Sequence, residues 1–429
     1  MTVHNKATRI RLADFSSPPM RAFHMTWMAF FLCFFGWFGI APLMPVIRQE
    51  FHLTKEQIGN LTIASVAITV LVRLLMGWLC DMIGPRRAYT ALLMIGSVPV
   101  MTVGLAHDYH AFLWFRLAIG AIGASFVITQ YHTSAMFAPN VVGTANATAA
   151  GWGNLGGGVT QMAMPLLFSV MVWLGAGPAR GWRMAMFVPG LLMFFMGIAY
   201  YKLTRDTVSG GHRGTRRKAS GAFVAACKDP RVWALFIIYA ACFGMELTID
   251  NIAALYFTDN FHLGLAAAGL VAGSFGMMNL FARALGGMLS DRLHRSHGLR
   301  GRALLLGATI FCEGMALMLF SRMSVLPLAI GAMMLAGLFI KMSNGVTYSL
   351  VPFVNRKGLG AVAGIVGAGG NVGSVMAGFL FRGSMPWAQA LLALGAGVTA
   401  VSILAVAVRF SEGEERAAQA AGELVATGN

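Results

Sequence analysis

Long apolar stretches follow one another along almost the whole chain, and they constrain its fold more than any other feature. Of the 429 residues, 57% are hydrophobic and only 11% are charged, and the mean hydropathy is +0.69. Soluble domains carry about 25% charged residues, whereas a stretch of about 18 or more apolar residues predicts a membrane-spanning helix. The sequence therefore predicts an all-α membrane protein.

Twelve such stretches are recognisable as membrane spans. They cover residues 24–47, 57–79, 88–106, 110–135, 141–172, 183–203, 230–257, 265–290, 301–321, 326–352, 358–381 and 386–408. The longest polar segment follows the sixth span and divides the chain into two halves. We therefore expect an N-terminal tail (1–23), a six-helix bundle (24–203), a basic linker (204–229), a second six-helix bundle (230–409) and a C-terminal tail (410–429).

The net charge of +16 reports the orientation of the chain in its membrane. When the N-terminal tail is placed in the cytoplasm, most of the 32 lysines and arginines fall on the cytoplasmic side, as the positive-inside rule requires. Both termini are then cytoplasmic, and the basic loops face anionic lipid rather than nucleic acid. The first 20 residues are polar and have no apolar core of a signal peptide.

The two halves repeat one another in sequence. The stretch RLLMGWLCD (Arg73–Asp81) and the stretch RALGGMLSD (Arg283–Asp291) share five of nine positions. A second echo joins GWGNLGGG (151–158) to GAGGNVGS (367–374) in the fifth helix of each half. Two parallel six-helix repeats with a site between them predict the major facilitator fold of secondary transporters.

The repeated GxLxD pattern predicts a gate at the cytoplasmic end of the second helix in each half. The glycine permits close helix contact, while the aspartate and nearby arginines form a charge network that latches one conformation. For the arginines, simple anchoring at the membrane surface is the alternative. The expected gating network comprises Gly77, Asp81, Arg87, Arg116, Gly287 and Asp291, with Arg116 as a partner of the aspartates.

Cations inside the spans are expensive unless they are paired, so each marks a candidate functional site. Arg73 and Arg283 lie eight residues before the loop aspartates, about 12 Å deeper along the helix. As repeat-related residues they should approach each other, and a planar oxyanion between them would match the guanidinium fork. The alternative is two independent arginines satisfied by backbone carbonyls or a local acid. Lys341 lines the pore or extends to the surface.

Embedded amides and acids complete the candidate site. Asn154 and Asn371 offer neutral donors at matching depth within the glycine-rich helices, although glycine packing alone is the alternative. Glu246 and Asp250 lie one turn apart on the seventh helix. Desolvation favours the neutral form of an isolated carboxyl group, so both acids are candidate proton carriers. An ion pair with Lys341, or exposure of Asp250 near the outer end, would exclude that role.

Several longer motifs resemble a known family. They are HMTWMAFFLCFFGWF with APL (24–43), TAAGWGNLGGGVTQ (148–161), YAACFGMELTIDN (239–251), VPFVNRKGLG (351–360) and GAGGNVG (367–373). The chain resembles the nitrate/nitrite porter family, above all its branch of high-affinity nitrate transporters. The resemblance implies that Arg73 and Arg283 hold the anion and that Asn154 and Phe126 contact it.

The resemblance implies import of nitrate, and also of nitrite, with proton symport, because Glu246 stands where the bacterial exchangers have no carboxylate. A short central loop and tail imply a bacterial inner-membrane protein that needs no accessory protein. Alternatives are a nitrate/nitrite antiporter, a carrier of another small anion, an organic acid or a drug, and a sensor or channel. No metal-ligand cluster, nucleotide loop or activated nucleophile is recognisable, so we expect neither an enzyme nor a cofactor.

Overall fold

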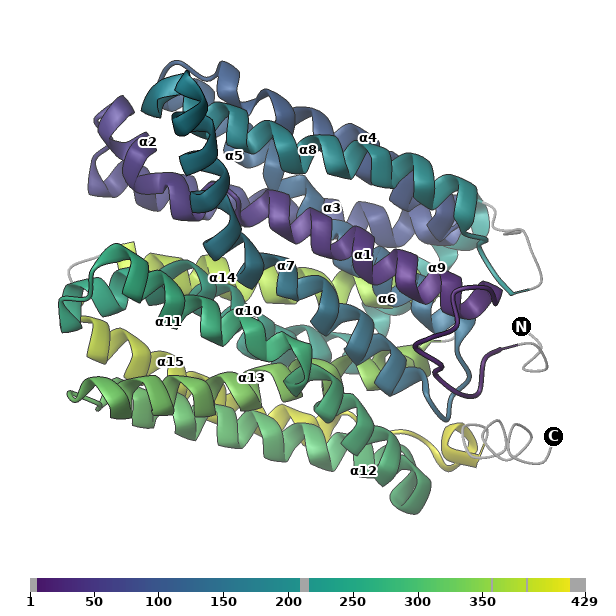
Figure 1. Cartoon of the computed structure of the whole chain (residues 1–429). Helices are drawn as coiled ribbons and strands as arrows, with labels where there is room; N and C mark the ends of the chain where they lie inside the picture. The colour runs from purple at the N-terminus through teal and green to yellow at the C-terminus, as the bar shows by residue number, and fades with distance from the viewer. Residues whose placement is uncertain (1–5, 209–215, 356–357, 383–384, 417–429) are drawn as a thin grey trace.

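The computed structural model describes residues 6–208, 216–355, 358–382 and 385–416, and these are almost entirely helical (Figure 1). The first half contains α1 (Pro18–Phe38), α2 (Met44–Phe51), α3 (Lys55–Ile83), α4 (Pro85–Thr102), α5 (Tyr109–Gly120), α6 (Ser125–Met136), α7 (Val142–Met171) and α8 (Gly177–Leu203). The second half contains α10 (Pro230–Phe261), α11 (Leu265–Met277), α12 (Ala282–Ser321), α13 (Leu326–Val354), α14 (Leu359–Arg382) and α15 (Trp387–Val401). Helix α9 (Arg216–Lys228) lies in the linker between them.

The number of membrane crossings agrees with the prediction. In the described part of the chain, 10 helical segments are long and apolar enough to cross a membrane. Two of them, of 62 and 55 residues, are far longer than the roughly 20 residues that one crossing needs. Both contain glycines with positive φ, namely Gly175 (92°) and Gly177 (67°) in the first and Gly298 (61°) in the second. The backbone departs from helical geometry at these glycines, and counting each segment as two crossings gives the predicted twelve.

Helix α1 begins at Pro18, ahead of the predicted span at residue 24. The Asp14 carboxylate accepts hydrogen bonds from the backbone N–H groups of Ser16 (2.9 Å) and Ser17 (3.0 Å). The Ser17 hydroxyl donates to the same carboxylate at 2.6 Å. This turn fixes the entry of the chain, and proline suits the first helical position because its missing N–H would have no partner there.

The two halves meet along helices that carry the repeated glycines. Helix α3 packs on α14, and α7 packs on α11, α12 and α13. A Cβ atom at Gly287 would lie 2.7 Å from the carbonyl oxygen of Gly143, so only glycine permits this approach. On α3 the contacts with α14 extend from Asp81 to Ile63, about 27 Å along the helix axis. This side of the interface is therefore closed over most of the membrane thickness.

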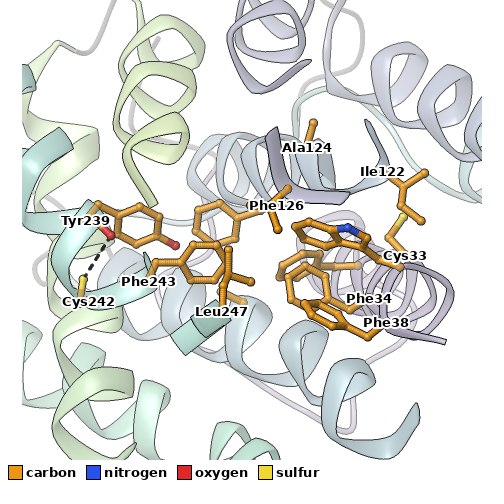
Figure 2. Close-up of a cluster of buried hydrophobic side chains, with 14 of the residues drawn as sticks. Cys33, Phe34, Phe38, Ile122, Ala124, Phe126, Tyr239, Cys242, Phe243 and Leu247 are labelled. Carbon is orange, nitrogen blue, oxygen red and sulfur yellow. Dashed lines mark hydrogen bonds between the residues drawn. The ribbon is translucent and has the colours of Figure 1, made fainter. Parts of the chain in front are cut away.

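A buried aromatic cluster links the halves near the middle of the molecule (Figure 2). Phe126 of α6 stacks at 5.7 Å between ring centroids on both Tyr239 and Phe243 of α10. Tyr239 and Phe243 are themselves parallel, with centroids 5.1 Å apart. Phe34 and Phe38 of α1 continue the cluster within the first half. The stack brings α6 and α10 together at one level of the bundle.

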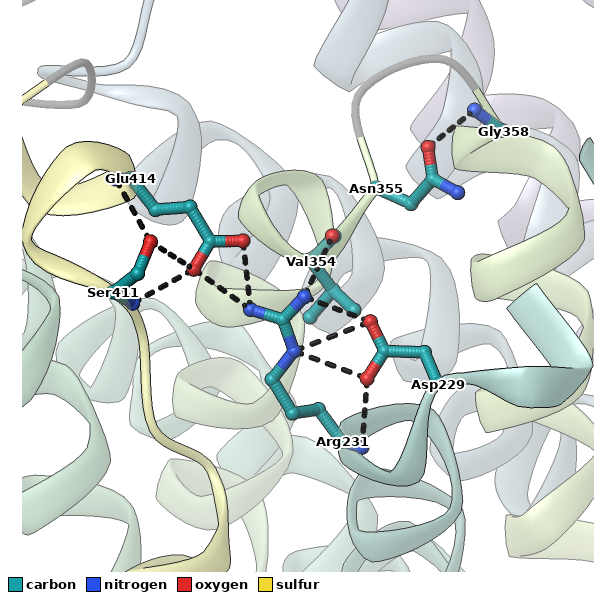
Figure 3. A network of polar contacts seen from close by, with 7 residues as sticks. All are labelled: Asp229, Arg231, Val354, Asn355, Gly358, Ser411 and Glu414. Carbon is teal, nitrogen blue, oxygen red and sulfur yellow. Dashed lines mark hydrogen bonds and ion pairs between the residues drawn. The ribbon is translucent and has the colours of Figure 1, made fainter. Parts of the chain in front are cut away.

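A polar network connects the linker to the C-terminal segment (Figure 3). Arg231 forms ion pairs with Asp229 (2.7 Å) and Glu414 (2.9 Å), and it donates to the carbonyl oxygen of Val354 at 3.4 Å. Partial burial raises the pKa of Glu414, hydrogen bonds from Ser411 and the charge of Arg231 lower it, and the net result is a pKa below the ordinary value. The network fixes the segment after α15 against the end of α13.

Candidate functional site

The structure brings Arg73 of α3 and Arg283 of α12 to the same pair of aromatic rings. The Cζ atom of Arg73 lies 5.3 Å from the ring centroid of Phe126 and 4.9 Å from that of Phe243. The corresponding distances for Arg283 are 5.2 Å and 5.7 Å. Both arginine side chains have no exposed area. Two guanidinium groups from opposite halves therefore share one enclosed aromatic site, where cation–π attraction offsets part of their desolvation.

The partners of the two arginines differ. Arg73 donates to the backbone carbonyls of Gly123 (3.3 and 3.4 Å) and Gly367, the latter belonging to the other half. Arg283 donates to the Tyr239 hydroxyl at 3.0 Å and lies 3.5 Å from Glu246. The local acid considered above as an alternative is therefore present beside Arg283, whereas no carboxylate pairs with Arg73 among the residues that the structure describes.

Glu246 on α10 is the polar centre of the site. Its Oε1 atom accepts hydrogen bonds from Asn279 (2.8 Å), Lys341 (3.1 Å) and Asn154 (3.2 Å). Its Oε2 atom accepts from Asn344 at 2.6 Å and lies 3.5 Å from Arg283. Only 1% of the residue is exposed. Five donors on α7, α12, α13 and the turn before α12 thus stabilise the charged carboxylate.

Glu246 was expected to carry protons because its carboxyl group was thought to be isolated. The five donors show that it is not isolated, so this reason no longer holds. The ion pair with Lys341, considered above as the alternative, is present. Lys341 also lies 4.0 Å from the ring centroid of Phe275 and is fully buried, so it does not extend to the surface. Asp250, one turn beyond Glu246, is half-buried and makes no ion pair with Lys341 in the described structure. Proton carriage by either acid remains a hypothesis.

The two repeat-related asparagines occupy different environments. The amide of Asn154 donates to Glu246, whereas the amide of Asn371 donates to the backbone carbonyl of Val66 at 3.4 Å. Of the two polar side-chain atoms of asparagine, only the amide nitrogen can donate to a carboxylate, so the contact with Glu246 fixes the orientation of the Asn154 amide. Both side-chain oxygens are buried without a donor in the described structure. Asn154 therefore belongs to the charged site, and Asn371 lies between α14 and α3 beside it.

The positive charges of the site exceed its negative charges, so an anion could bind there. Arg73, Arg283 and Lys341 contribute three positive charges, and their ion pairs in the described chain involve only Glu246. The Nε–H of Arg283 is buried and has no acceptor there. A buried donor without a partner costs about 1–3 kcal/mol. A small oxyanion between the guanidinium groups would supply both an acceptor and the missing negative charge.

Several members of the site were not recognised in the sequence, although helical spacing points to them. Tyr239 precedes Glu246 by seven residues, which is two turns of α10. Asn279 lies four residues before Arg283, and Asn344 lies three residues after Lys341. Positions three, four or seven residues from a buried charge share its helix face. Tyr348 of α13, which meets the Phe126 ring edge-on at 4.6 Å, follows Lys341 by seven residues and so carries the same signal.

The two loop aspartates hold the halves together through helix N-termini. Asp81 of α3 accepts from the backbone N–H groups of Gly360 (3.3 Å) and Ala361 (3.0 Å) at the start of α14. Asp291 of α12 accepts at 2.6 Å from both the N–H and the hydroxyl of Thr144 at the start of α7. The first N–H groups of a helix lack partners within it and attract negative charge. Each half thus caps a helix of the other.

The remaining residues of the expected gating network, two glycines and two arginines, differ in their contacts. Gly77 and Gly287 face backbone atoms of the opposite half, as the close approach requires. Arg302, which the sequence did not single out, pairs with Asp291 at 2.8 Å. Arg116 lies in the first half of its crossing and donates to the carbonyl of Trp37 at 3.3 Å. The expectation that Arg116 pairs with the loop aspartates is wrong in this conformation. Arg116 lies near the start of the crossing Tyr109–Met136, whereas the loop aspartates lie at the level of its other end. Arg87 is exposed.

Comparison with known proteins agrees with this architecture. The sequence profile of the Major Facilitator Superfamily matches residues 26–378. The structure also resembles the proton:xylose symporter XylE with a TM-score of 0.70, covering 94% of this chain and 99% of that one at 13% identity. It resembles the human organic anion transporter MFSD10 with a TM-score of 0.68, covering 91% of this chain and 100% of that one at 13% identity. At such identities the structural likeness concerns the fold alone.

Sequence relatives are closer. High affinity nitrate transporter 2.5 of Arabidopsis thaliana is 40% identical, with 94% of this chain and 81% of the relative covered. High-affinity nitrate transporter 2.3 of rice (Oryza sativa subsp. japonica) is 39% identical, with 88% and 74% covered. The nitrate/nitrite transporter NrtP of Nostoc punctiforme is 28% identical, with 83% and 85% covered. The chain therefore belongs to the Major Facilitator Superfamily and, within it, to the nitrate/nitrite porter family.

Proposed function

We propose that this chain imports nitrate, and also nitrite, by alternating access of a single anion site between its two halves, with protons as the co-transported ion. One observation carries the proposal most directly. Two fully buried guanidinium groups, one from each half, face the same aromatic rings, and one of them, Arg73, donates only to backbone carbonyls in the described structure. A bound anion links the halves through these two groups.

The chemistry of the site favours a small planar oxyanion. The guanidinium fork donates two parallel hydrogen bonds to such a group, and the flat rings of Phe126 and Phe243 bound the space beside it. An organic acid or a drug would need a wider lining with more varied polar groups. The printed names of the plant and cyanobacterial relatives specify nitrate and nitrite. Another small anion remains the second candidate, and competition assays against labelled nitrate distinguish it.

Energetics favours proton symport over uniport. An inside-negative potential opposes entry of each anionic charge by about 2.3 kcal/mol per 100 mV. Co-transport of two or more protons reverses the sign of the transported charge, so the same potential then drives uptake. A nitrate/nitrite antiporter would instead need an outgoing anion. The excess of basic residues in the loops supports an orientation with both termini in the cytoplasm. The short central loop supports transport in a bacterial inner membrane without an accessory protein.

The latch residues fit alternating access. Asp81 and Asp291 bond to helix starts of the opposite half, so these contacts must break when the halves rock apart at that end. Anion binding between Arg73 and Arg283 acts on the same two helices, α3 and α12, that carry the aspartates. Occupancy of the site and closure of the latch are thereby coupled through two rigid elements.

Substitution of the arginines tests the proposal. In proteoliposomes, Arg73→Lys and Arg283→Lys should each reduce nitrate uptake by about tenfold or more, because lysine keeps the charge but loses the fork. Arg116→Lys is the matched control, since Arg116 is also a buried arginine but lies away from the site and contacts Trp37. It should retain uptake. Parental uptake in Arg73→Lys or Arg283→Lys, or equal loss in all three variants, would refute the anion clamp.

A further inference from the structure

A buried acid outside the anion site has no ion-pair partner in the described part of the chain. Glu313 lies on α12 after the break at Gly298 and has no exposed area. Within the described residues its carboxyl oxygens make no hydrogen bond of good geometry, and the donor nearest to them is the Ser343 hydroxyl. It lies 12 residues from Gly301 and eight from Ser321, about 18 Å and 12 Å along the helix from the ends of its crossing. An acid is therefore held near the middle of the membrane with nothing to compensate its charge.

Among the residues that the structure describes, no cation forms an ion pair with Glu313. Helix α13 presents the buried Ser343 hydroxyl, which lies close enough to donate weakly to the Glu313 carboxyl group. From α10, Glu246 and Cys242 lie close enough to interact with it electrostatically. Helix α15, which packs on the same part of α12, carries no ionisable residue. The one lysine of α13, Lys341, pairs with Glu246 instead.

The contrast with Glu246 identifies the state of the group. Five donors, two of them cationic, surround Glu246, whereas in the described structure Glu313 has only the neutral Ser343 hydroxyl beside it. An ionised carboxylate without donors in an apolar interior costs several kcal/mol, and nearby Glu246 adds repulsion. Burial without an opposite charge therefore favours the neutral form of Glu313 in this conformation.

From this geometry we infer that Glu313 binds one of the co-transported protons of the transport cycle, an inference that rests on the proton symport proposed above. When the site faces outward, the Glu313 carboxylate takes a proton from water and becomes a carboxylic acid. When the site faces inward, that O–H bond breaks, the proton returns to water, and the carboxylate is restored. Glu246 remains ionised throughout and positions Arg283.

Coupling to the anion follows from the shared neighbours. Ser343 faces Glu313, and the next residue, Asn344, bonds to Glu246 at 2.6 Å. Glu246 in turn contacts the clamp residue Arg283. Protonation of Glu313 removes a negative charge from the vicinity of the anion site, so proton and nitrate favour each other's binding. Thermodynamic linkage makes that preference reciprocal.

The test compares two transport modes in proteoliposomes that contain the full-length protein. Glu313→Gln fixes the neutral form in the same volume. We expect its nitrate uptake driven by a pH gradient to fall about tenfold relative to its nitrate counterflow without a gradient, within the usual range of coupling between two sites. Glu313→Asp keeps a titratable group and should restore part of the gradient response. Glu50→Gln, which alters an ion pair with Arg183 away from the site, is the matched control.

Proton movement supplies the second readout. Addition of nitrate should cause proton uptake by the parent and by Glu50→Gln, but not by Glu313→Gln. A Glu313→Gln protein with the parental ratio of the two transport modes would overturn the inference while leaving proton symport intact. A variant that melts normally but loses both modes equally would also overturn it, since Glu313 would then position the anion site. A parent without any gradient response would refute proton symport itself, and the inference with it.

Discussion

Asp81 and Asp291 each cap a helix of the opposite half. We predict that removing the charge of one aspartate affects the protein differently from removing the charge of the other. Asp81→Asn keeps the shape of the side chain but removes the charge that accepts from Gly360 and Ala361. A hydrogen bond to a charged acceptor is about 1 kcal/mol stronger than one to a neutral acceptor, so two bonds give about 2 kcal/mol. That difference shifts the equilibrium toward the open latch by about thirtyfold.

Asp291→Asn should have the larger effect. It weakens two hydrogen bonds from Thr144 and also leaves Arg302, which has no exposed area, without its ion-pair partner. Removal of one partner from a buried ion pair costs about 3–5 kcal/mol. We therefore expect Asp291→Asn to lower the melting temperature of the purified protein, whereas Asp81→Asn opens the latch with little loss of global stability.

Hydrogen exchange measured by mass spectrometry reads the latch directly. The first N–H groups of a helix have no partner in their own helix, so their protection depends on the capping aspartate. Asp81→Asn should speed exchange in residues 359–364 by about thirtyfold, and Asp291→Asn should act more strongly on residues 142–147. Asp206→Asn is the control, because Asp206 lies at the start of the linker and accepts from the backbone N–H of Arg86 in the first half, so it does not connect the two halves. Unchanged exchange in residues 359–364 of Asp81→Asn would refute the reasoning.

Two further predictions concern the helix interface and the amides. Gly287→Ala would place a Cβ atom 2.7 Å from the Gly143 carbonyl oxygen, so nitrate uptake should fall about tenfold or more, while Gly397→Ala, with no atom within 4 Å, should transport normally. Equal uptake in the two glycine variants would contradict the need for close approach. Asn154→Ala should reduce uptake by about tenfold because it removes a donor from Glu246, and Asn371→Ala should reduce it less, since it loses only a weak bond to Val66. Uptake measurements in which Asn371→Ala is the more damaging change would show that the repeat-related amides have been assigned in the wrong order.

The fold was predictable because the membrane restricts the choices of the chain. Each backbone polar group must find its partner within a helix, so apolar length alone identifies the crossings. The internal repeat then predicts that Arg73 and Arg283 approach each other, since a twofold relation between halves brings equivalent residues together. The structure agrees on both points. These predictions needed only local pattern and symmetry.

The environment of each buried charge was not predictable in the same way. Glu246 looked isolated because the asparagines and the lysine that surround it come from segments between 33 and 98 residues distant in sequence. Glu313 lies inside the predicted span 301–321, so the sequence places an acid in the membrane but does not show that no cation faces it. Asn154 and Asn371 match in sequence, yet the second half supplies a carboxylate to one, whereas a backbone carbonyl of the first half faces the other.

The features that follow the internal repeat were determined by the sequence, and the features in which the two halves differ were decided by the tertiary structure. Apolar length and the repeated motifs determined the twelve crossings, the pairing of the two arginines and the location of the two loop aspartates. The tertiary structure decided which carboxylate is compensated and which is left alone, because electrostatic free energy depends on the distances between groups that the chain order does not contain. The two halves keep the same backbone plan, and the side chains at their interface break its symmetry.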